Sequence, residues 1–357
     1  MDRKGTKTET GKRAVRKPKR IDSYQAKLEK KPRFNAGHSY RWADYLELLC
    51  LANIDGELSK SDIIDRFAGR ELDFQEGDPD DVNEMLDLTE EVSNSTSRAE
   101  IPDKWLNRAN DWFRLLQVRT VLYKESYPFV VSDSEIKRKK TITKKQLVYL
   151  FFLSCSNLHL FPKQHQTMLA DCFEISCLKA VKNILPAHAD VNHFGSNQFN
   201  VDTRYGKRTL WKKLEQLTKD ICENLKSTIK RENHLHMGDS GLDILGLIDT
   251  GDKLPSRLIF FGQCTCQEKW WDKQSEASFE EWGNKIQFHT RFTSMTFIPF
   301  CYRDANAEWI DTGKLAQSFL VDRNRLMYYL DGKFEGLKKL PAYNLVQTVI
   351  SAKESIF

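Results

Sequence analysis

The stretch GDSGLDILGLIDTGDKLPSRLIFFGQCTCQEKWW, from Gly238 to Trp271, decides the expected fold of this chain. Two apolar runs, Ser240–Ile248 and Arg257–Cys266, are separated by a segment rich in Gly, Asp and Pro, which are common turn formers. This pattern predicts a hairpin of two antiparallel strands. If the turn is symmetric, Asp243 on the first strand lies about opposite Gln263 on the second, and the register can place both side chains on one face.

Asp243 is unusual because the residues around it in its strand are apolar: Leu242, Ile244, Leu245 and Leu247. A carboxylate in so apolar a strand costs several kcal/mol unless something compensates its charge. A divalent metal ion is one such compensation, and a salt bridge to a partner side chain is the other. Either would account for an acidic residue at this place.

The hairpin resembles the metal-binding strands of the PD-(D/E)XK nucleases, the restriction-endonuclease-like superfamily. In that family an Asp on the first strand, and a Glu or Gln two residues before a Lys on the second, hold Mg²⁺. Asp243 fits the first position and Gln263 the second, whereas Thr265 stands where the family has Lys. The resemblance covers roughly residues 200–302, under half of the chain, and implies an α-β-β-β-α-β core.

The resemblance implies a Mg²⁺ or Mn²⁺ site whose ligands are Asp243, the amide oxygen of Gln263 and the backbone carbonyl of residue 264. Such oxygen ligands are those that Mg²⁺ prefers. A Glu on the preceding helix often completes the site in the family. Glu215, in an amphipathic helix expected over 209–229, corresponds to that residue. The alternative for Glu215 is a solvated side chain among neighbouring lysines.

Phosphodiester cleavage also requires positive charge near the transition state, which Thr265 cannot supply. Lys269, and less directly Lys273 at the start of a helix expected over 273–288, are the available substitutes. A lysine within about 4 Å of the Asp243 carboxylate would favour the nuclease, whereas two lysines that both point to solvent would favour a nuclease fold that has lost catalysis. Arg323 and Arg325 are further candidates for contact with nucleic acid, although a structural salt bridge is the more ordinary explanation.

Composition sets broader limits on the class of protein. The chain has 357 residues, of which 40% are hydrophobic and 29% charged, as in an ordinary soluble protein. No apolar run approaches the ~18 residues of a membrane span. We expect no secretory signal, because no apolar region follows the charged N-terminus. Eight Cys residues without a regular framework predict a reduced, cytoplasmic protein.

Residues 1–33 form a basic tail with 13 Lys and Arg residues against 4 Asp and Glu residues, a net charge of +9. The tail is poor in apolar residues and is expected to be disordered. It either adds sequence-independent affinity for nucleic-acid phosphates or is simply solvated.

The expected architecture is a mainly helical N-terminal domain, residues 34–190, followed by an α/β (α+β) restriction-endonuclease-like core, residues 191–357. Apolar residues at helical spacing predict helices over 105–123, 145–155 and 166–184 in the first domain.

The predicted function is a metal-dependent nuclease that cleaves DNA, with RNA not excluded. The resemblance implies a role in restriction or anti-phage defence, as a homodimer or beside a partner protein. The first alternative is a catalytically inactive nuclease-fold module that binds DNA or takes part in assembly. The second is an unrelated α/β protein with an ordinary buried Asp.

Overall fold

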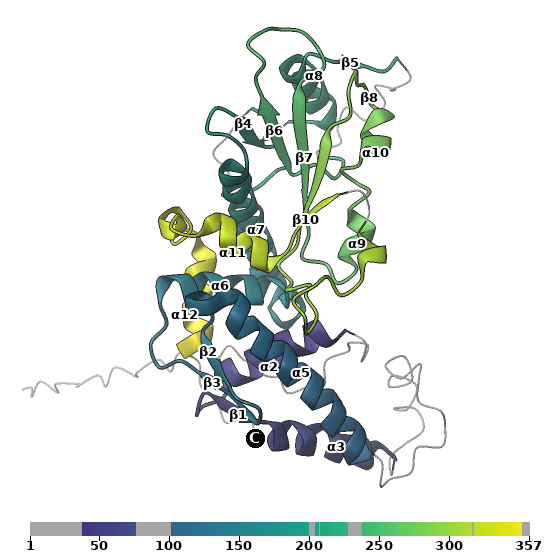
Figure 1. Ribbon diagram of the computed structural model, residues 1–357. Coiled ribbons are helices and arrows are strands. Elements are labelled where there is room, and N and C mark those ends of the chain that lie inside the picture. Colours follow the sequence, from purple (N-terminus) through teal and green to yellow (C-terminus); the bar gives the residue numbers. More distant parts are fainter. Residues whose placement is uncertain are drawn as a thin grey trace, which may run out of the picture.

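The computed structural model describes residues 38–75, 101–199, 204–206, 208–227, 238–315 and 318–351. It is a mixed α/β structure in which a five-stranded sheet occupies one end and most of the helices the other (Figure 1). The predicted basic tail, residues 1–33, lies outside the described residues. Within them, no helix combines the length and the apolar character that crossing a membrane would require.

The helical end is formed by elements that precede the large sheet in sequence. These are α2 (Ser39–Ala52), α3 (Lys60–Gln75), α5 (Ile101–Tyr123), η1 (Lys124–Ser126), α6 (Lys144–Cys155), η2 (Leu158–Leu160) and α7 (Lys163–Ile184). A small antiparallel sheet with the order β1-β3-β2 lies among them: β1 (Glu57–Ser59), β2 (Phe129–Val131) and β3 (Glu135–Arg138). The helices predicted over 105–123, 145–155 and 166–184 are confirmed. The start of α6 shows how the sequence fixes an end, because Thr143 and Gln146 form a reciprocal capping box.

The five-stranded sheet has the order β10-β9-β7-β6-β4. Its strands are β4 (Asp190–His193), β6 (Ile244–Ile248), β7 (Leu258–Cys264), β9 (Thr293–Phe297) and β10 (Phe319–Val321). β6 is antiparallel to both of its neighbours, β4 and β7, whereas β9 lies parallel to β7 and β10 parallel to β9. The predicted hairpin is therefore confirmed as β6 and β7, at the centre of the sheet.

Alternation of side chains along β7 divides the core into two layers. Ile259 and Phe261 belong to a cluster with α8 (Leu210–Ile221), whose Leu214, Leu217 and Ile221 are buried. Cys264 belongs instead to a larger cluster that includes residues of α7. The helix predicted over 209–229 is shorter than expected, because Cys222 adopts the left-handed conformation and ends α8.

The helix predicted over 273–288 is wrong, because this segment forms two short helices, α9 (Trp270–Lys273) and α10 (Phe279–Gly283). The cause is local: the Ser278 hydroxyl accepts the Glu281 backbone N–H and starts a new helix. The remaining elements of this part are β5 (Asn224–Leu225), β8 (Ile286–Gln287), which pairs with β5, and η4 (Thr312–Lys314).

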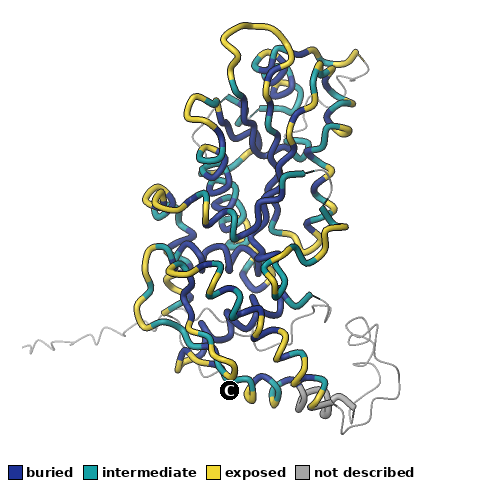
Figure 2. Tube along the Cα trace, in the orientation of Figure 1, coloured by how far each residue is buried: buried dark blue, intermediate teal, exposed yellow. Residues whose placement is uncertain are grey.

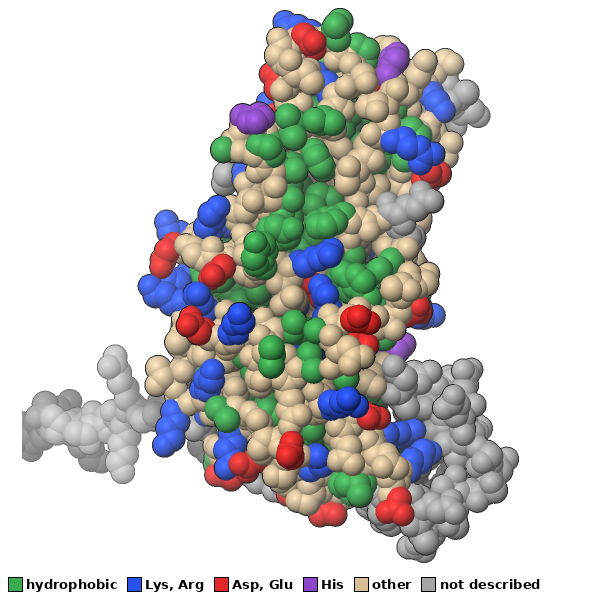
Figure 3. Space-filling model, in the orientation of Figure 1, with side chains coloured by type: hydrophobic (Ala, Val, Ile, Leu, Met, Phe, Trp, Pro, Cys, Tyr) green, Lys and Arg blue, Asp and Glu red, His purple; other side chains and the backbone are tan. Residues whose placement is uncertain are grey.

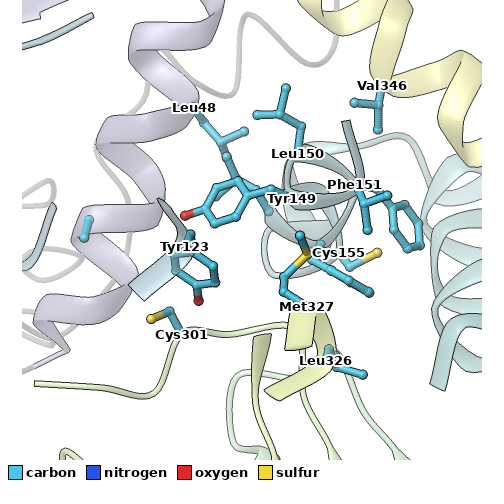
Figure 4. Packing of buried hydrophobic residues seen from close by; sticks show 14 of the residues in the cluster. Leu48, Tyr123, Tyr149, Leu150, Phe151, Cys155, Cys301, Leu326, Met327 and Val346 are labelled. Atoms are coloured by element: carbon cyan, nitrogen blue, oxygen red, sulfur yellow. The ribbon is translucent and has the colours of Figure 1, made fainter. Parts of the chain in front are cut away.

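The chain returns to the helical end after the sheet. α11 (Arg323–Leu330), η5 (Phe334–Gly336) and α12 (Pro341–Ser351) lie with α6 and α7 (Figure 1). Leu326 and Met327 of α11 pack in the same buried cluster as Tyr149 and Leu150 of α6 (Figure 4). Buried residues run without a break from the sheet into the helices (Figure 2). The division predicted at residue 190 coincides with the start of β4, but these C-terminal helices lie with those that precede it.

Candidate active site

The candidate site lies where β6 begins and β7 ends. Ile244 pairs with Gly262, so the register places Asp243 opposite Gln263, as the sequence predicts. The Asp243 backbone N–H donates to the Gly262 carbonyl at 2.9 Å. The Cys264 backbone N–H donates to Asp243 Oδ2 at 2.6 Å. Asp243 is thus held on the edge of the hairpin by two backbone hydrogen bonds, with its side chain 7% exposed.

Gln263 has an incompletely bonded side chain. Its Nε2 donates to the neighbouring Cys264 carbonyl at 3.3 Å. Its Oε1 is buried and accepts no hydrogen bond from any of the residues that the structure describes. Leaving a buried acceptor without a partner costs roughly 1–3 kcal/mol, so an orphaned oxygen is a mark of a missing ligand.

Two further carboxylates, from different elements, surround Asp243. Asp239 lies in the loop before β6, and Glu174 lies on α7. Gly195 lies next to both Asp239 and Asp243: a Cβ atom on this glycine would be 3.2 Å from Asp239 Oδ2 and 3.7 Å from Asp243 Oδ1. Because Gly195 has no side chain, space is left beside these two carboxylates.

Glu174 is oriented by residues that follow β4. His193 Nε2 lies 3.0 Å from Glu174 Oε2, and Asn197 Nδ2 donates to the same oxygen at 2.9 Å. The other ring nitrogen of His193 lies 3.1 Å from the Gly195 carbonyl oxygen. Glu174 is therefore held by polar contacts that leave its second oxygen, Oε1, available.

The accumulated negative charge changes the acidity of Asp243. Burial raises the pKa of Asp243 well above its usual value, and the charges of Glu174 and Asp239 raise it further. The hydrogen bond from the Cys264 N–H opposes this, and the charge of Glu276 adds to the increase. No basic side chain among the described residues forms an ion pair with Asp243. The salt bridge that would have explained this acid is absent from that part of the chain.

Among the residues that the structure describes, the site lacks a positive charge paired with Asp243, and the buried Lys213 of α8 is the side chain best placed to supply one. Its side chain is 0% exposed, and its Nζ donates one hydrogen bond, to the Gly238 carbonyl at 3.3 Å. Burial lowers the pKa of Lys213, while the charges of Asp239 and Asp243 oppose that shift. Lysines are almost never fully buried unless they are paired, so this one points to a functional role.

A cleft of about 590 Å³ opens beside Asp239, between the loop before β6 and the segment containing α10. Four carboxylates line it: Asp239, Glu276, Glu280 and Glu281. Its negative potential repels a bare phosphate and attracts a divalent cation. A phosphodiester could approach from this side only together with positive charge.

The structure separates Glu215 from this site. Glu215 accepts a hydrogen bond from the Trp211 indole N–H on its own helix, at 2.8 Å. Glu215 follows Lys213 by two residues, and side chains two residues apart on an α-helix differ in direction by about 200° around its axis. Lys213 points toward the carboxylates, so Glu215 points away from them. Glu174 on α7 is the glutamate that the fold brings to Asp243.

Neither of the two lysines expected to replace the family's Lys forms an ion pair with Asp243 among the described residues. Lys269 is exposed at the start of α9. Lys273 forms an ion pair with Glu276 at 2.6 Å. Thr265 is buried and its hydroxyl accepts the Gln267 backbone N–H. Lys269 thus points to solvent, whereas Lys273 is bound to a carboxylate beside the site. With neither lysine paired to Asp243, catalysis would require Lys213 to supply the charge.

The expectation that Arg323 contacts nucleic acid is wrong, because Arg323 is fully buried. Its Nη2 lies 2.7 Å from Asp44 Oδ2, and its Nε donates to the Pro299 carbonyl. The structural salt bridge, the more ordinary explanation, is the one observed. Arg325 is half-buried, and one of its N–H groups donates to the Leu320 carbonyl.

Neither Lys213 nor Glu174 was predicted from the sequence, although the position of Lys213 in its helix is unusual. Lys213 lies three residues after Leu210 and four before Leu217, within the apolar stripe of α8, where a solvated lysine is not expected. Glu174 follows Phe173 in a helix whose role could not be read from its sequence. Only the packing of α7 against the sheet brings it to the hairpin.

Comparison of the chain with protein-family models, with curated proteins and with solved structures finds no match. Its function must therefore be inferred from the geometry of the site.

Proposed function

We propose that this protein is a metal-dependent nuclease that hydrolyses phosphodiester bonds in DNA. The observation that carries the proposal is the pair formed by Asp243 and Gln263, in which the buried Gln263 Oε1 has no hydrogen-bond partner within the part of the chain that the structure describes. Restriction or anti-phage defence, in a homodimer or with a partner protein, is the role that the resemblance to PD-(D/E)XK nucleases implies.

The order of elements around the hairpin is consistent with that resemblance. The order along the chain is α7, β4, α8, β5, β6, β7, the short helices α9 and α10, β8 and β9, so α8, β5 and β8 are additions to the family's core in this alignment. This corresponds to the outline α-β-β-β-α-β, with β4, β6 and β7 as the antiparallel strands and β9 parallel to β7. In this alignment the first helix is α7 rather than α8, which supports Glu174 as the glutamate of the site.

The donors at the site suit Mg²⁺ or Mn²⁺ better than a metal that needs a closed protein cage. In the described residues, no group of three or more His, Cys, Asp or Glu side chains is close enough to hold a metal ion. Mg²⁺ commonly uses one or two carboxylates, keeps several waters and takes further oxygens from substrate phosphate. Asp243, Asp239, Gln263 Oε1 and the Cys264 carbonyl would hold it.

When bound, such an ion would lower the pKa of a coordinated water and stabilise charge on the phosphate. Lys213 would supply the fixed positive charge that Thr265 cannot, from the opposite wall of the site. Because its ammonium is buried, its field is less screened than that of an exposed lysine. His193 and Asn197 would hold Glu174 in place toward the carboxylates.

A nuclease-fold module without catalysis is the second candidate function. It is favoured by the exposure of Lys269 and by the pairing of Lys273 with Glu276, which remove both expected substitutes for the family's Lys. In this alternative, Asp243 and its neighbours are remnants, and Lys213 serves only to offset their charge.

The test is incubation with supercoiled DNA, single-stranded DNA and RNA in Mg²⁺, Mn²⁺ or EDTA. Nicking should require the metal, and Asp243→Ala should abolish it. Lys213→Met should lower the rate by roughly 10²–10³, the usual effect of removing one preorganised charge. Lys212→Met, at the exposed neighbouring position, is the matched control and should leave the rate unchanged within about twofold.

Two outcomes would overturn the proposal. Metal-dependent nicking that persists in Asp243→Ala would remove this site from the reaction. No cleavage of any substrate by the unaltered chain, combined with retained DNA binding, would favour the non-cleaving module. Thermal unfolding of each variant establishes that a lost activity is not a lost fold.

A further inference from the structure

A second cleft lies at the helical end, away from the residues of the candidate site. It has a volume of about 560 Å³, within the range of ligand pockets. It is formed by the end of α5, η1, the start of α6 and α11, together with one arginine that precedes β10. Its lining includes Lys124, Lys145, Arg303, Arg325, Tyr328 and Asp331.

Two arginines of this cleft are held by stacking on the same aromatic ring. The guanidinium carbon of Arg303 lies 3.8 Å from the centre of the Trp309 ring, and that of Arg325 lies 4.9 Å from it. Arg325 also lies 4.9 Å from the centre of the Phe319 ring. Stacking restricts a guanidinium without using its N–H groups. Arg303 donates to Asp322 and to the Ala307 carbonyl, whereas Arg325 donates from Nη1 to the Leu320 carbonyl, so the other N–H groups of Arg325 are the ones offered to an anion such as phosphate.

The charges lining the cleft do not cancel. Four basic side chains face two carboxylates, a net charge of +2. Both carboxylates, Asp331 and Glu125, lie near Lys145, at 2.9 and 3.8 Å. Arg303 pairs with Asp322. Arg325 and the exposed Lys124 form no ion pair with any residue that the structure describes.

An exposed aromatic side chain stands beside these cations. Tyr328 of α11 is 76% exposed, although it is among the largest apolar side chains of the chain. On the face that carries α11, Lys and Arg side chains lie next to hydrophobic ones (Figure 3). A ring available for stacking beside unpaired cations is the combination that binds a base together with its phosphate.

We propose that this cleft binds a nucleotide, with its phosphate on Arg325 and Lys124 and its base on Tyr328. The ligand is either a free nucleotide or one unit of a nucleic-acid strand, since both present the same chemistry. The proposal does not depend on the proposed cleavage, because none of its residues belongs to the site around Asp243.

The test is binding by the full chain in EDTA, where no metal-dependent cleavage occurs. AMP is followed by calorimetry, and a short fluorescein-labelled single-stranded oligonucleotide by anisotropy at several salt concentrations. Arg325→Met should weaken binding roughly ten- to hundredfold through loss of charge-assisted hydrogen bonds. Lys124→Met should make the slope of log affinity against log salt less steep by about 0.7 for the oligonucleotide. Tyr328→Ala should weaken binding without changing that slope.

The controls separate this cleft from other basic parts of the chain. Arg291→Met alters an exposed arginine outside the cleft and should bind like the parent. The basic residues of 1–33 are common to all variants and cancel in the comparison. If the cleft variants bind both AMP and the oligonucleotide more weakly than the parent, the cleft is a free-nucleotide site. If they bind only the oligonucleotide more weakly, the cleft contacts a nucleic-acid strand. Equal affinity of Arg325→Met, Lys124→Met and the parent for both probes would overturn the proposal, provided that each variant unfolds at the parent's temperature.

Discussion

Two buried groups of charged residues lie in this molecule, and they differ in how completely they are paired. The first joins α2 to α11: Asp44 contacts Arg119 and Arg323 at 2.7 Å each, and Glu47 contacts Arg119 at 2.8 Å. The hydroxyl of Tyr149 donates to Glu47 as well. Acids and arginines are equal in number, and the hydroxyls of Tyr127 and Ser156 add hydrogen bonds to Glu47 and Asp44.

The second group, around Asp243, has the opposite character. Asp239 and Glu174 lie close enough to Asp243 for their charges to raise its pKa, and among the described residues the buried Lys213 near them donates one hydrogen bond, to a backbone carbonyl. Gln263 leaves an oxygen without a partner among the described residues. Buried charged and polar groups without partners cost free energy, and they are expected where a ligand supplies the missing contacts. The comparison therefore separates a group that holds the fold from one that is built for binding.

The largest effect should follow from breaking the paired group. Arg323→Met leaves Asp44 with one guanidinium instead of two, and removing one partner of a buried ion pair commonly costs about 3–5 kcal/mol. The free energy of unfolding in urea measures this loss. Arg291→Met removes an arginine from an exposed pair with Glu280 and should cost under about 1 kcal/mol. A cost for Arg323→Met as small as that of the control would mean that the group does not hold the two ends together.

Removing the charge of Asp243, in the unpaired group, should raise the free energy of unfolding rather than lower it. Asp243→Asn keeps an oxygen that can accept the Cys264 N–H and removes a carboxylate that burial and its neighbours disfavour. Without metal at neutral pH, we expect this variant to be more stable by about 1–3 kcal/mol, the usual cost of an incompletely bonded buried polar group. Asp44→Asn should instead destabilise the protein. A loss of stability in both variants would remove the distinction between the two groups.

The dependence of these effects on pH has a defined sign. The folded-state pKa of Asp243 lies above its unfolded value, so the stability of the parent falls as pH rises from one to the other. The stabilisation by Asp243→Asn should be complete above the folded pKa and disappear below about 3.9.

For Asp44, burial raises the pKa, but the charges of Arg323 and Arg119 outweigh burial and hold the pKa below its usual value. Ionised Asp44 therefore stabilises the protein above the unfolded pKa, and this contribution is lost as pH falls through the folded one. The cost of Asp44→Asn should shrink in acid, and urea unfolding over a series of pH values measures both trends.

The hairpin and its polar pair could be predicted from the sequence because they are local. Two apolar runs and a turn set the register, and the register alone places Asp243 opposite Gln263. Residues brought in from other elements could not be predicted in this way. Glu174 reaches the site only because α7 packs on the sheet, and nothing in the spacing of α7 indicates which of its faces meets β4 and β7.

Long-range pairing explains the error at Arg323. Its partner Asp44 lies 279 positions earlier in the chain, on the first described helix. No local sequence pattern indicates that α11 returns to the helical end. Arg323 and Arg325, beside Asp322, could therefore be interpreted as a phosphate contact. The same return of the chain creates the cleft that Arg325 lines. One arginine of the cluster is therefore structural and the other available.

The smallest effect should come from Glu215, and it tests which helix serves the site. Glu215 is partly exposed, and its described partner is the Trp211 indole of its own helix, so Glu215→Gln should change the free energy of unfolding by under about 0.5 kcal/mol. Its rate of metal-dependent nicking should match that of the parent within about twofold. Glu174→Gln is the paired variant: it removes a charge beside Asp243 while keeping an oxygen for His193 and Asn197, and it should lower the rate or the affinity for metal. A loss of nicking in Glu215→Gln, with Glu174→Gln unaffected, would show that α8 rather than α7 supplies the third acid, and the charged group around Asp243 would have to be redrawn.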